Sequence, residues 1–243
     1  MAKRLIDVLL SALILAAAAP MLALAMLLVF AHDGAAPLYC GERVGRGGTA
    51  FRMAKIRTMA AGADRAGGSS TARSDARITP PGRLLRRCKL DELPQFWNVL
   101  CGQMSIVGPR PNTRRGGVDR YTAEEMRLLA VRPGITDLAS IVFADEAEIL
   151  EGAPDPDARY DAVVRPWKSR LGLLYVERRS LAVDLRVIRL TALALVARPL
   201  ALRGVVAILR AWDADPALVE VCRRRAPLRG AEPPGAPRWR AQA

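Results

Sequence analysis

Two adjacent carboxylates, Asp91 and Glu92, directly follow a basic stretch that holds Arg86, Arg87 and Lys89. An aspartate can cap the start of a helix, and a proline three residues later is tolerated in the first turn. The helix dipole and the neighbouring cations favour an ionised carboxylate, so we expect Asp91 to be charged at neutral pH. Such a carboxylate is a competent nucleophile or magnesium ligand. The alternative is that the pair only caps a helix.

Cations beside constrained backbone are candidate phosphate ligands. Arg110 lies between two prolines that fix its backbone, which suits a guanidinium forked onto phosphate, although a rigid surface turn would look the same. Arg132 precedes a Pro-Gly turn in a similar way. Lys55 and Arg57 are two residues apart, so we expect them on one face of a strand. The candidate phosphate-binding residues are Lys55, Arg57, Arg86, Arg110 and Arg132.

Other residue types narrow the chemistry. The only histidine, His32, has no partner motif, which argues against a histidine triad or an HExxH zinc site. The four cysteines form no CxxC pair, so we interpret them as reduced thiols, with neither zinc nor disulfides implied. The acid, base or nucleophile is therefore expected to be a carboxylate, a thiol or a lysine.

Positive charge dominates, with 37 Lys and Arg against 24 Asp and Glu and a formal net charge of +13. Between residues 43 and 120 there are 16 basic and five acidic residues. The expected partners are phosphates and anionic lipid. We do not expect nucleic acid, because aromatic residues make up only 5% and no recognition motif occurs.

An apolar run from Val8 to Ala31 contains one polar side chain, Ser11, and could reach across a bilayer core. Pro20 falls at its middle, where it should kink or break the helix. Positive charge flanks both ends of the run, whereas a simple span should have one depleted side. We therefore predict a re-entrant membrane helix with both ends on the cytoplasmic face. The alternative is an ordinary transmembrane helix with a tolerated proline.

Four further segments have patterns that predict their local structure. Residues 42–59 contain three glycines and predict a hairpin with a glycine turn. Thr122 followed by Glu125 predicts a capping-box helix start. The apolar stretch 181–212 is interrupted by arginines, which fits a helix in the membrane interface or a core helix pair broken at Pro199. After Asp213 the chain is rich in Pro and Arg and is predicted to be disordered.

Several short motifs occur in a specific order and spacing. They are Lys3-Arg4-x-x-Asp7, Glu42-Arg43-Val44-Gly45, Lys55-x-Arg57-Thr58-Met59, Ser74-Asp75-x-Arg77-Ile78-Thr79, Leu90 to Asn98, Met104 to Pro111, Arg132 to Thr136, Tyr175-Val176 through Arg179-Ser180, and Asp184-Leu185. Through these motifs the sequence resembles the monotopic polyprenyl-phosphate phosphoglycosyl transferases, also called bacterial sugar transferases, over most of its length.

The resemblance implies an enzyme that moves a sugar-1-phosphate from a UDP-sugar to undecaprenyl phosphate. In this family the residue matching Asp91 attacks the β-phosphorus, releases UMP and forms a phosphosugar-aspartyl intermediate. The resemblance also implies Mg²⁺, with Asp91 and Glu92 as candidate ligands, and a role for Glu92 in metal or proton handling. The implied pathway is the start of exopolysaccharide, capsule, O-antigen or glycoprotein glycan synthesis. The alternatives are a non-catalytic membrane scaffold and an inactive relative.

We therefore predict a mainly α fold with a small β-hairpin, in which the re-entrant helix packs on a compact cytoplasmic catalytic domain with interfacial amphipathic helices. The predicted units are the membrane helix (1–34), the catalytic domain (35–190), an apolar interfacial segment (191–212) and the tail (213–243). The expected location is the bacterial inner membrane. The sequence leaves open the sugar and the choice between a monomer and a homodimer.

Overall fold

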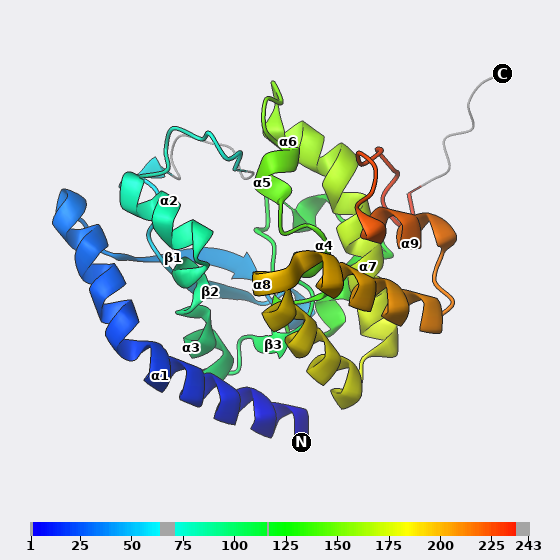
Figure 1. The fold of residues 1–243 in the computed structure, drawn as a ribbon, viewed down its shortest axis with the longest axis horizontal. Helices are drawn as coiled ribbons and strands as arrows, with labels where there is room; N and C mark the ends of the chain where they lie inside the picture. The colour runs from blue at the N-terminus through cyan, green and yellow to red at the C-terminus, as the bar shows by residue number, and fades with distance from the viewer. Residues whose placement is uncertain (1, 64–70, 116, 237–243) are drawn as a thin grey trace.

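A computed structural model of the chain describes residues 2–63, 71–115 and 117–236. Helices dominate, and two small two-stranded sheets lie among them (Figure 1). The α-helices are α1 (Ala2–Asp33), α2 (Pro80–Arg87), α3 (Gln95–Leu100), α4 (Leu138–Val142), α5 (Glu146–Ile149), α6 (Pro156–Arg159), α7 (Arg165–Arg178), α8 (Leu181–Ala211) and α9 (Pro216–Arg223). The 3-10 helices are η1 (Arg46–Gly48), η3 (Leu90–Glu92), η4 (Val118–Arg120) and η5 (Glu125–Ala130), and η6 (Tyr160–Val164) is a π-helix. The strands are β1 (Leu38–Val44), β2 (Ala50–Ile56), β3 (Ser105–Val107) and β4 (Gly134–Thr136).

The predicted hairpin is confirmed, with bounds that differ by a few residues. Strands β1 and β2 pair antiparallel, with Leu38 opposite Ile56 and Val44 opposite Ala50. The turn between them uses Gly47 and Gly48, whose φ angles of +68° and +80° favour glycine. The parallel pair β3–β4 was not predicted. Strands of three residues are too short for an alternating pattern to identify them.

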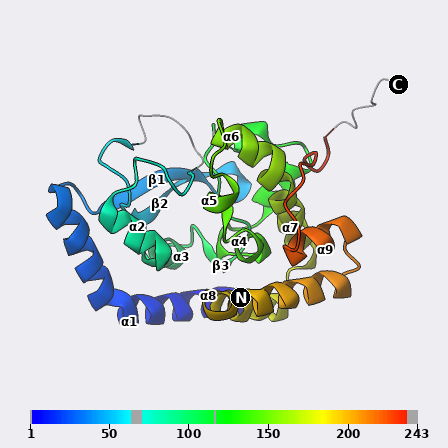
Figure 2. The ribbon, with the colours of Figure 1, turned by 45° about the horizontal axis from the view of Figure 1, so that its top comes forward.

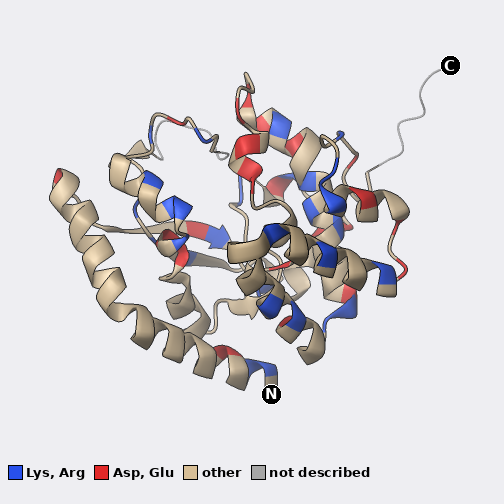
Figure 3. Ribbon diagram, in the orientation of Figure 1, with Lys and Arg blue, Asp and Glu red and all other residues tan. Residues whose placement is uncertain are grey.

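Helix α1 continues through Pro20, and its ribbon changes direction near the middle of the helix (Figures 1 and 2). A proline removes one backbone donor and displaces the preceding turn, which accounts for a kink without a break. Apart from its two ends, α1 carries almost no charge (Figure 3). The described residues contain two helices, α1 and α8, that by length and composition alone could cross a membrane.

One face of α1 packs on the domain near both of its ends. At the start, Arg4 donates to the carbonyls of Val99 and Leu100 at 2.6 and 2.9 Å, and the buried Asp7 accepts from Ser105 Oγ and Ile106 N. Near the end, Ala25 and Val29 form a small apolar cluster with Ile56 and Leu85. The opposite face of α1 presents apolar side chains to solvent. These exposed residues are Leu5, Leu9, Leu13, Met21, Leu24, Leu27, Leu28 and Phe30.

Helix α8 is folded into a pair of helical halves. Its backbone leaves the helical region at Ala197, two residues before Pro199, as expected for the residues that precede a proline. The second half packs back on the first so closely that a Cβ on Gly204 would lie 2.3 Å from the Cδ2 of Leu190. The break therefore matches the helix-pair alternative. Leu195, Val196 and Leu200, near the break, are exposed.

The prediction of a disordered tail after Asp213 is wrong for the residues that the structure describes. Helix α9 begins at an Asp215 cap and buries Leu218, Val219 and Cys222. These three apolar positions share one helical face, a pattern that the Pro/Arg-rich composition of the segment concealed. Further on, Trp167 Nε1 donates to the carbonyl of Arg229 at 3.0 Å. Residues 237–243 lie outside the described part of the chain.

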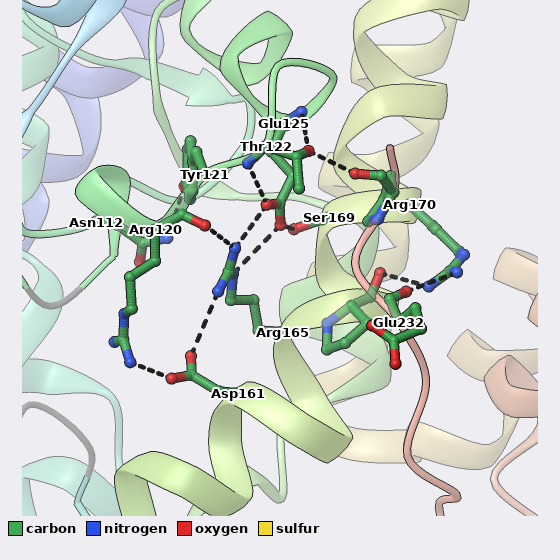
Figure 4. A network of polar contacts seen from close by, with 12 residues as sticks. Asn112, Arg120, Tyr121, Thr122, Glu125, Asp161, Arg165, Ser169, Arg170 and Glu232 are labelled. Atoms are coloured by element: carbon green, nitrogen blue, oxygen red, sulfur yellow. Dashed lines mark hydrogen bonds and ion pairs between the residues drawn. The ribbon is translucent and has the colours of Figure 1, made fainter. Parts of the chain in front are cut away.

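A buried polar network supports the centre of the domain (Figure 4). The predicted capping box is confirmed: Glu125 N donates to Thr122 Oγ1 at 3.1 Å, and Thr122 N donates to Glu125 Oε2 at 3.0 Å. The helix that follows is the 3-10 helix η5. The fully buried Glu125 carboxylate also accepts from Arg165 Nη2 at 2.6 Å and from Ser169 Oγ at 2.6 Å. The network thereby joins η5 to α7.

Candidate active site

The carboxylate pair lies in a tight turn between two helices. Lys89 adopts a left-handed conformation with φ of 56° and separates α2 from η3, which contains both Asp91 and Glu92. Helix α3 starts only at Gln95, with Pro94 as its N-cap. The prediction that Asp91 caps this helix is therefore wrong. Asp91 lies inside a 3-10 turn, and the α-helical hydrogen bonds begin four residues later, at Gln95.

Asp91 is buried and incompletely satisfied. Its residue surface is 5% exposed, and its Oδ1 has no hydrogen-bond partner among the described residues. Burial raises the pKa of Asp91, and the charge of Lys55 only partly opposes this effect. Desolvation of the charged form outweighs the nearby cations, an effect that the prediction from the helix dipole and these cations left out. The site thus holds a carboxylate with a free oxygen.

Glu92 has the opposite environment. Arg110 forks onto its carboxylate, with Nη2 on Oε1 and Nη1 3.2 Å from Oε2, and Lys55 Nζ lies 3.2 Å from Oε1. Burial raises the pKa of Glu92, but the charges of Arg110 and Lys55 lower it more, so the net pKa is well below the ordinary value. Glu92 is therefore ionised and held in place on both oxygens.

Arg110 is positioned by the β3–β4 pair. Gly108 N donates to the carbonyl of Thr136 at 3.1 Å, and Gly134 N donates to that of Pro109 at 3.0 Å. These bonds fix the backbone just before Arg110. The predicted pre-positioned guanidinium is therefore present, and its ligand in the structure is Glu92.

Arg86 completes the cationic side of the site. It donates from Nε to Thr58 Oγ1 at 2.8 Å, and the strongest of its charge interactions is the attraction to Asp91. Burial lowers the pKa of Arg86, and the attraction of Asp91 opposes that effect. The structure thus brings together Lys55, Arg86 and Arg110 around Asp91 and Glu92.

Arg57 and Arg132 have their described contacts elsewhere. Arg57 follows the last residue of β2, so strand alternation no longer places it beside Lys55, and it pairs with both oxygens of Asp33 at 2.6 Å. Arg132 donates to the carbonyl of Gly102 at 2.8 Å. The partner Asp33 is distant in sequence, so the motif alone could not indicate that Arg57 connects the end of α1 to the domain.

Two residues near the pair were missed as site candidates. Arg43 lies close enough to Arg110 that burial, together with repulsion from that charge, lowers the pKa of its guanidinium. Gln95 is fully buried, and both its amide atoms lack a partner among the described residues. It lies four residues after Asp91, which places the two side chains on about the same face of consecutive helical turns. No signal in the residue types marked Gln95, because its burial depends on tertiary packing.

The residues fit a magnesium ion only in part. No cluster of three or more His, Cys, Asp or Glu that could hold a metal occurs among the described residues. Mg²⁺ commonly takes one or two carboxylates and completes its shell with phosphate oxygens and water. The free oxygen of Asp91 suits that role. Both oxygens of Glu92 are already paired with cations, so Glu92 could bind the ion only after releasing one of them.

The site contains one buried carboxylate with a free oxygen, a second carboxylate that is fixed, and three cations around them, next to a long apolar helix. This arrangement is suited to a phosphate group. A match to the bacterial sugar transferase family covers residues 1–198. The chain belongs to this family.

Individual relatives support the assignment. The chain is 41% identical over 142 residues to the UDP-glucose:undecaprenyl-phosphate glucose-1-phosphate transferase of Caulobacter vibrioides, covering 57% of this chain and 53% of that protein. It is 36% identical over 195 residues to the undecaprenyl-phosphate glucose phosphotransferase of Komagataeibacter xylinus, covering 78% and 35%. It is 36% identical over 154 residues to the exopolysaccharide production protein ExoY of Sinorhizobium fredii, covering 57% and 68%. The matched part of the chain spans about half the length of the first of these relatives.

Proposed function

We propose that this protein is a phosphoglycosyl transferase that moves a sugar-1-phosphate from a UDP-sugar to undecaprenyl phosphate, as the first step of exopolysaccharide or related glycan synthesis. The observation that carries the proposal is the unpaired, buried oxygen of Asp91 beside a fixed and ionised Glu92. A buried polar atom without a partner is uncommon and calls for an explanation. Attack of this oxygen on the electrophilic phosphorus of the donor would explain why it has no partner.

The donor step follows from these positions. A carboxylate oxygen of Asp91 attacks the β-phosphorus, a phosphorus–oxygen bond to Asp91 forms, and the bond to the α-phosphate oxygen breaks to release UMP. Lys55, Arg86 and Arg110 surround the pair and would offset the charge of the diphosphate and of the departing phosphate. In the second step a phosphate oxygen of undecaprenyl phosphate attacks the same phosphorus, and the Asp91 carboxylate leaves.

Glu92 acts chiefly by holding charge in place. Its ion pairs fix Lys55 and Arg110 at positions from which they can reach a diphosphate, so no reorganisation is needed when the donor binds. A magnesium ion bound at Asp91 and the diphosphate would supply further neutralisation of the leaving group.

We also propose that α1 is re-entrant and that the domain lies on the cytoplasmic face of the bacterial inner membrane. Both ends of α1 contact one folded domain, through Arg4 and Asp7 at the start and through Asp33 at the end. A helix that crossed the bilayer would place its ends about 30 Å apart, on opposite sides of the hydrocarbon. The exposed apolar face of α1 would then lie in a single leaflet.

The test is release of UMP from a panel of UDP-sugars by detergent-solubilised protein with Mg²⁺ and undecaprenyl phosphate. We expect turnover by the natural protein, and loss of at least about 10³-fold in Asp91→Asn, because the amide is not a nucleophile here. Asp119→Asn is the matched control, since this exposed aspartate of η4 forms no described contact with the site. A non-catalytic scaffold would show no turnover with any donor, and an unaffected Asp91→Asn would mean another nucleophile.

A further inference from the structure

A shallow apolar groove lies between the end of α1 and the start of α2. Its volume is about 410 Å³, and it is lined by Leu28, Ala31, His32, Pro80, Pro81 and Leu84. Two of its leucines are well exposed, Leu28 at 44% and Leu84 at 55%. Exposure of such an apolar surface to water is unfavourable, so we expect the groove to bind an apolar ligand.

The groove continues the exposed apolar face of α1. Leu24 and Leu28 are one helical turn apart on that face, and both side chains are exposed. If this face lies in lipid, as proposed above, a hydrocarbon chain can enter the groove from the bilayer without crossing water. The ion pair of Asp33 with Arg57 follows directly after the groove on α1 and places polar groups at its end.

Helix α2 connects the groove to the catalytic pair. Pro80, Pro81 and Leu84 share one face of the helix, and Arg87 continues this face one turn later. Arg87 is exposed and forms no hydrogen bond or ion pair with any described residue. Asp91 follows only four residues further on. A ligand along this face would therefore meet apolar surface first and then the guanidinium of Arg87, whose neighbour in sequence, Arg86, interacts with Asp91.

The position of α2 is fixed by tight backbone packing. A Cβ on Gly82 would lie 2.0 Å from the carbonyl oxygen of Thr58, so α2 lies directly against the chain that follows β2. Thr58 also accepts the hydrogen bond from Arg86, which interacts with Asp91. The groove and the catalytic pair are thus held at a constant separation.

We propose that this groove binds the isoprenoid chain of the polyprenyl phosphate acceptor and that Arg87 binds its phosphate. An amphiphile with an apolar tail and an anionic head matches the order of surfaces along α2. In this arrangement a phosphate oxygen of the acceptor attacks the phosphorus on Asp91, a new phosphorus–oxygen bond forms, and the Asp91 carboxylate leaves. The inference rests on the proposed function and names the part of the site that takes the acceptor.

The experiment separates the two half-reactions. Without acceptor, UMP release up to one equivalent per protein reports the donor step; with acceptor, product formation over a series of undecaprenyl phosphate concentrations gives the acceptor KM. We expect Leu84→Asn and Arg87→Gln each to raise the acceptor KM roughly tenfold while the one-equivalent UMP release persists. The matched control is Leu195→Asn, a 71% exposed leucine on α8, which should change neither.

A water-soluble, short-chain prenyl phosphate distinguishes the contact of the isoprenoid chain with Leu84 from the contact of the phosphate with Arg87. With this acceptor, Leu84→Asn should behave like the natural protein, whereas Arg87→Gln should still weaken binding. Equal effects of Leu84→Asn and Leu195→Asn on the acceptor KM would overturn the groove and indicate an ordinary lipid-facing surface. An acceptor KM that is unchanged in both Leu84→Asn and Arg87→Gln would also overturn it. Absence of UMP release by the natural protein would instead refute the proposed function.

Discussion

The two neighbouring carboxylates differ in environment more than in chemistry. Asp91 is desolvated and keeps one oxygen free, whereas Glu92 is held by two cations. Their pKa values move in opposite directions from the ordinary carboxyl value. Carboxylates separated in this way commonly take different roles at a site, one reactive and one electrostatic. This division favours Asp91 over Glu92 as the nucleophile.

The raised pKa of Asp91 predicts a pH dependence. Attack requires the ionised carboxylate, so kcat/KM for UMP release should rise with pH through a value above the ordinary 3.8. The charge of Lys55 lowers this pKa, so Lys55→Met should move the acid limb to higher pH. Lys55→Arg keeps the charge and is the control. An acid limb that stays in place in Lys55→Met would show that Lys55 does not act on Asp91.

The same shifts set opposite contributions to folding. The raised pKa of Asp91 stabilises the folded protein at low pH, and this contribution is lost as pH rises through the folded-state pKa. The lowered pKa of Glu92 stabilises the fold above the ordinary glutamate pKa, and its contribution is lost as pH falls.

At the residue scale, local sequence predicted the groups but not all their partners. Asp91, Glu92, Lys55, Arg86 and Arg110 were identified from types and short spacings, and the structure brings these five together. The argument for an ionised Asp91 left out the effect of burial on its pKa, because burial is a tertiary property. The partner of Arg57 lies 24 positions away, a contact that no local pattern contains.

At the scale of elements, the short parallel pair β3–β4 determines where Arg110 lies. A Cβ on Gly134 would be 2.1 Å from the backbone nitrogen of Gly108 and 2.3 Å from its oxygen. Such distances require backbone to move, so the two strands can approach this closely only because both positions are glycine. The Pro-Arg-Pro loop depends on this contact as much as on its own prolines.

Gly134→Ala should therefore separate the strands and displace Arg110 from Glu92. We expect UMP release to fall at least about 10²-fold, since small misplacements of a positioning group are costly, with a loss of about 1–3 kcal/mol in unfolding free energy. The control is Gly204→Ala, whose Cβ would meet only the end of the Leu190 side chain, which can turn away. Thermal unfolding and UMP release measure the two effects. Full activity in Gly134→Ala would show that Arg110 needs no such support.

The hairpin and the capping box were predictable because glycine turns and Thr-x-x-Glu act within a few residues. Helix α9 was missed because its three buried positions matter only where α8 returns to cover them. Elements whose stability comes from tertiary packing leave the weakest local signal.

At the scale of the whole molecule, α1 and α8 run along the same side of the protein, at the bottom of Figure 2, and the hairpin and α2 lie above them. Lys3 joins these two helices by an ion pair of 2.7 Å to the buried Asp184, which also accepts from Tyr175. The contacts at the start of α1 are therefore made with the interior of the domain. The N-terminus is expected to stay on the side of the membrane where the domain folds.

This arrangement predicts that both ends of α1 react with a membrane-impermeant maleimide from the same side. Cys40 is exposed a few residues after α1 and reports its end, in a chain with Cys88→Ser and Cys101→Ser. Ala2→Cys, in a chain that also carries Cys40→Ser, reports the start. In oriented bacterial membranes we expect both cysteines to be labelled from the cytoplasmic face only, with lysed membranes as the control for reactivity. Labelling of the two positions from opposite faces would establish a spanning helix, and the contacts of Arg4 and Asp7 with the domain could then not form in the membrane.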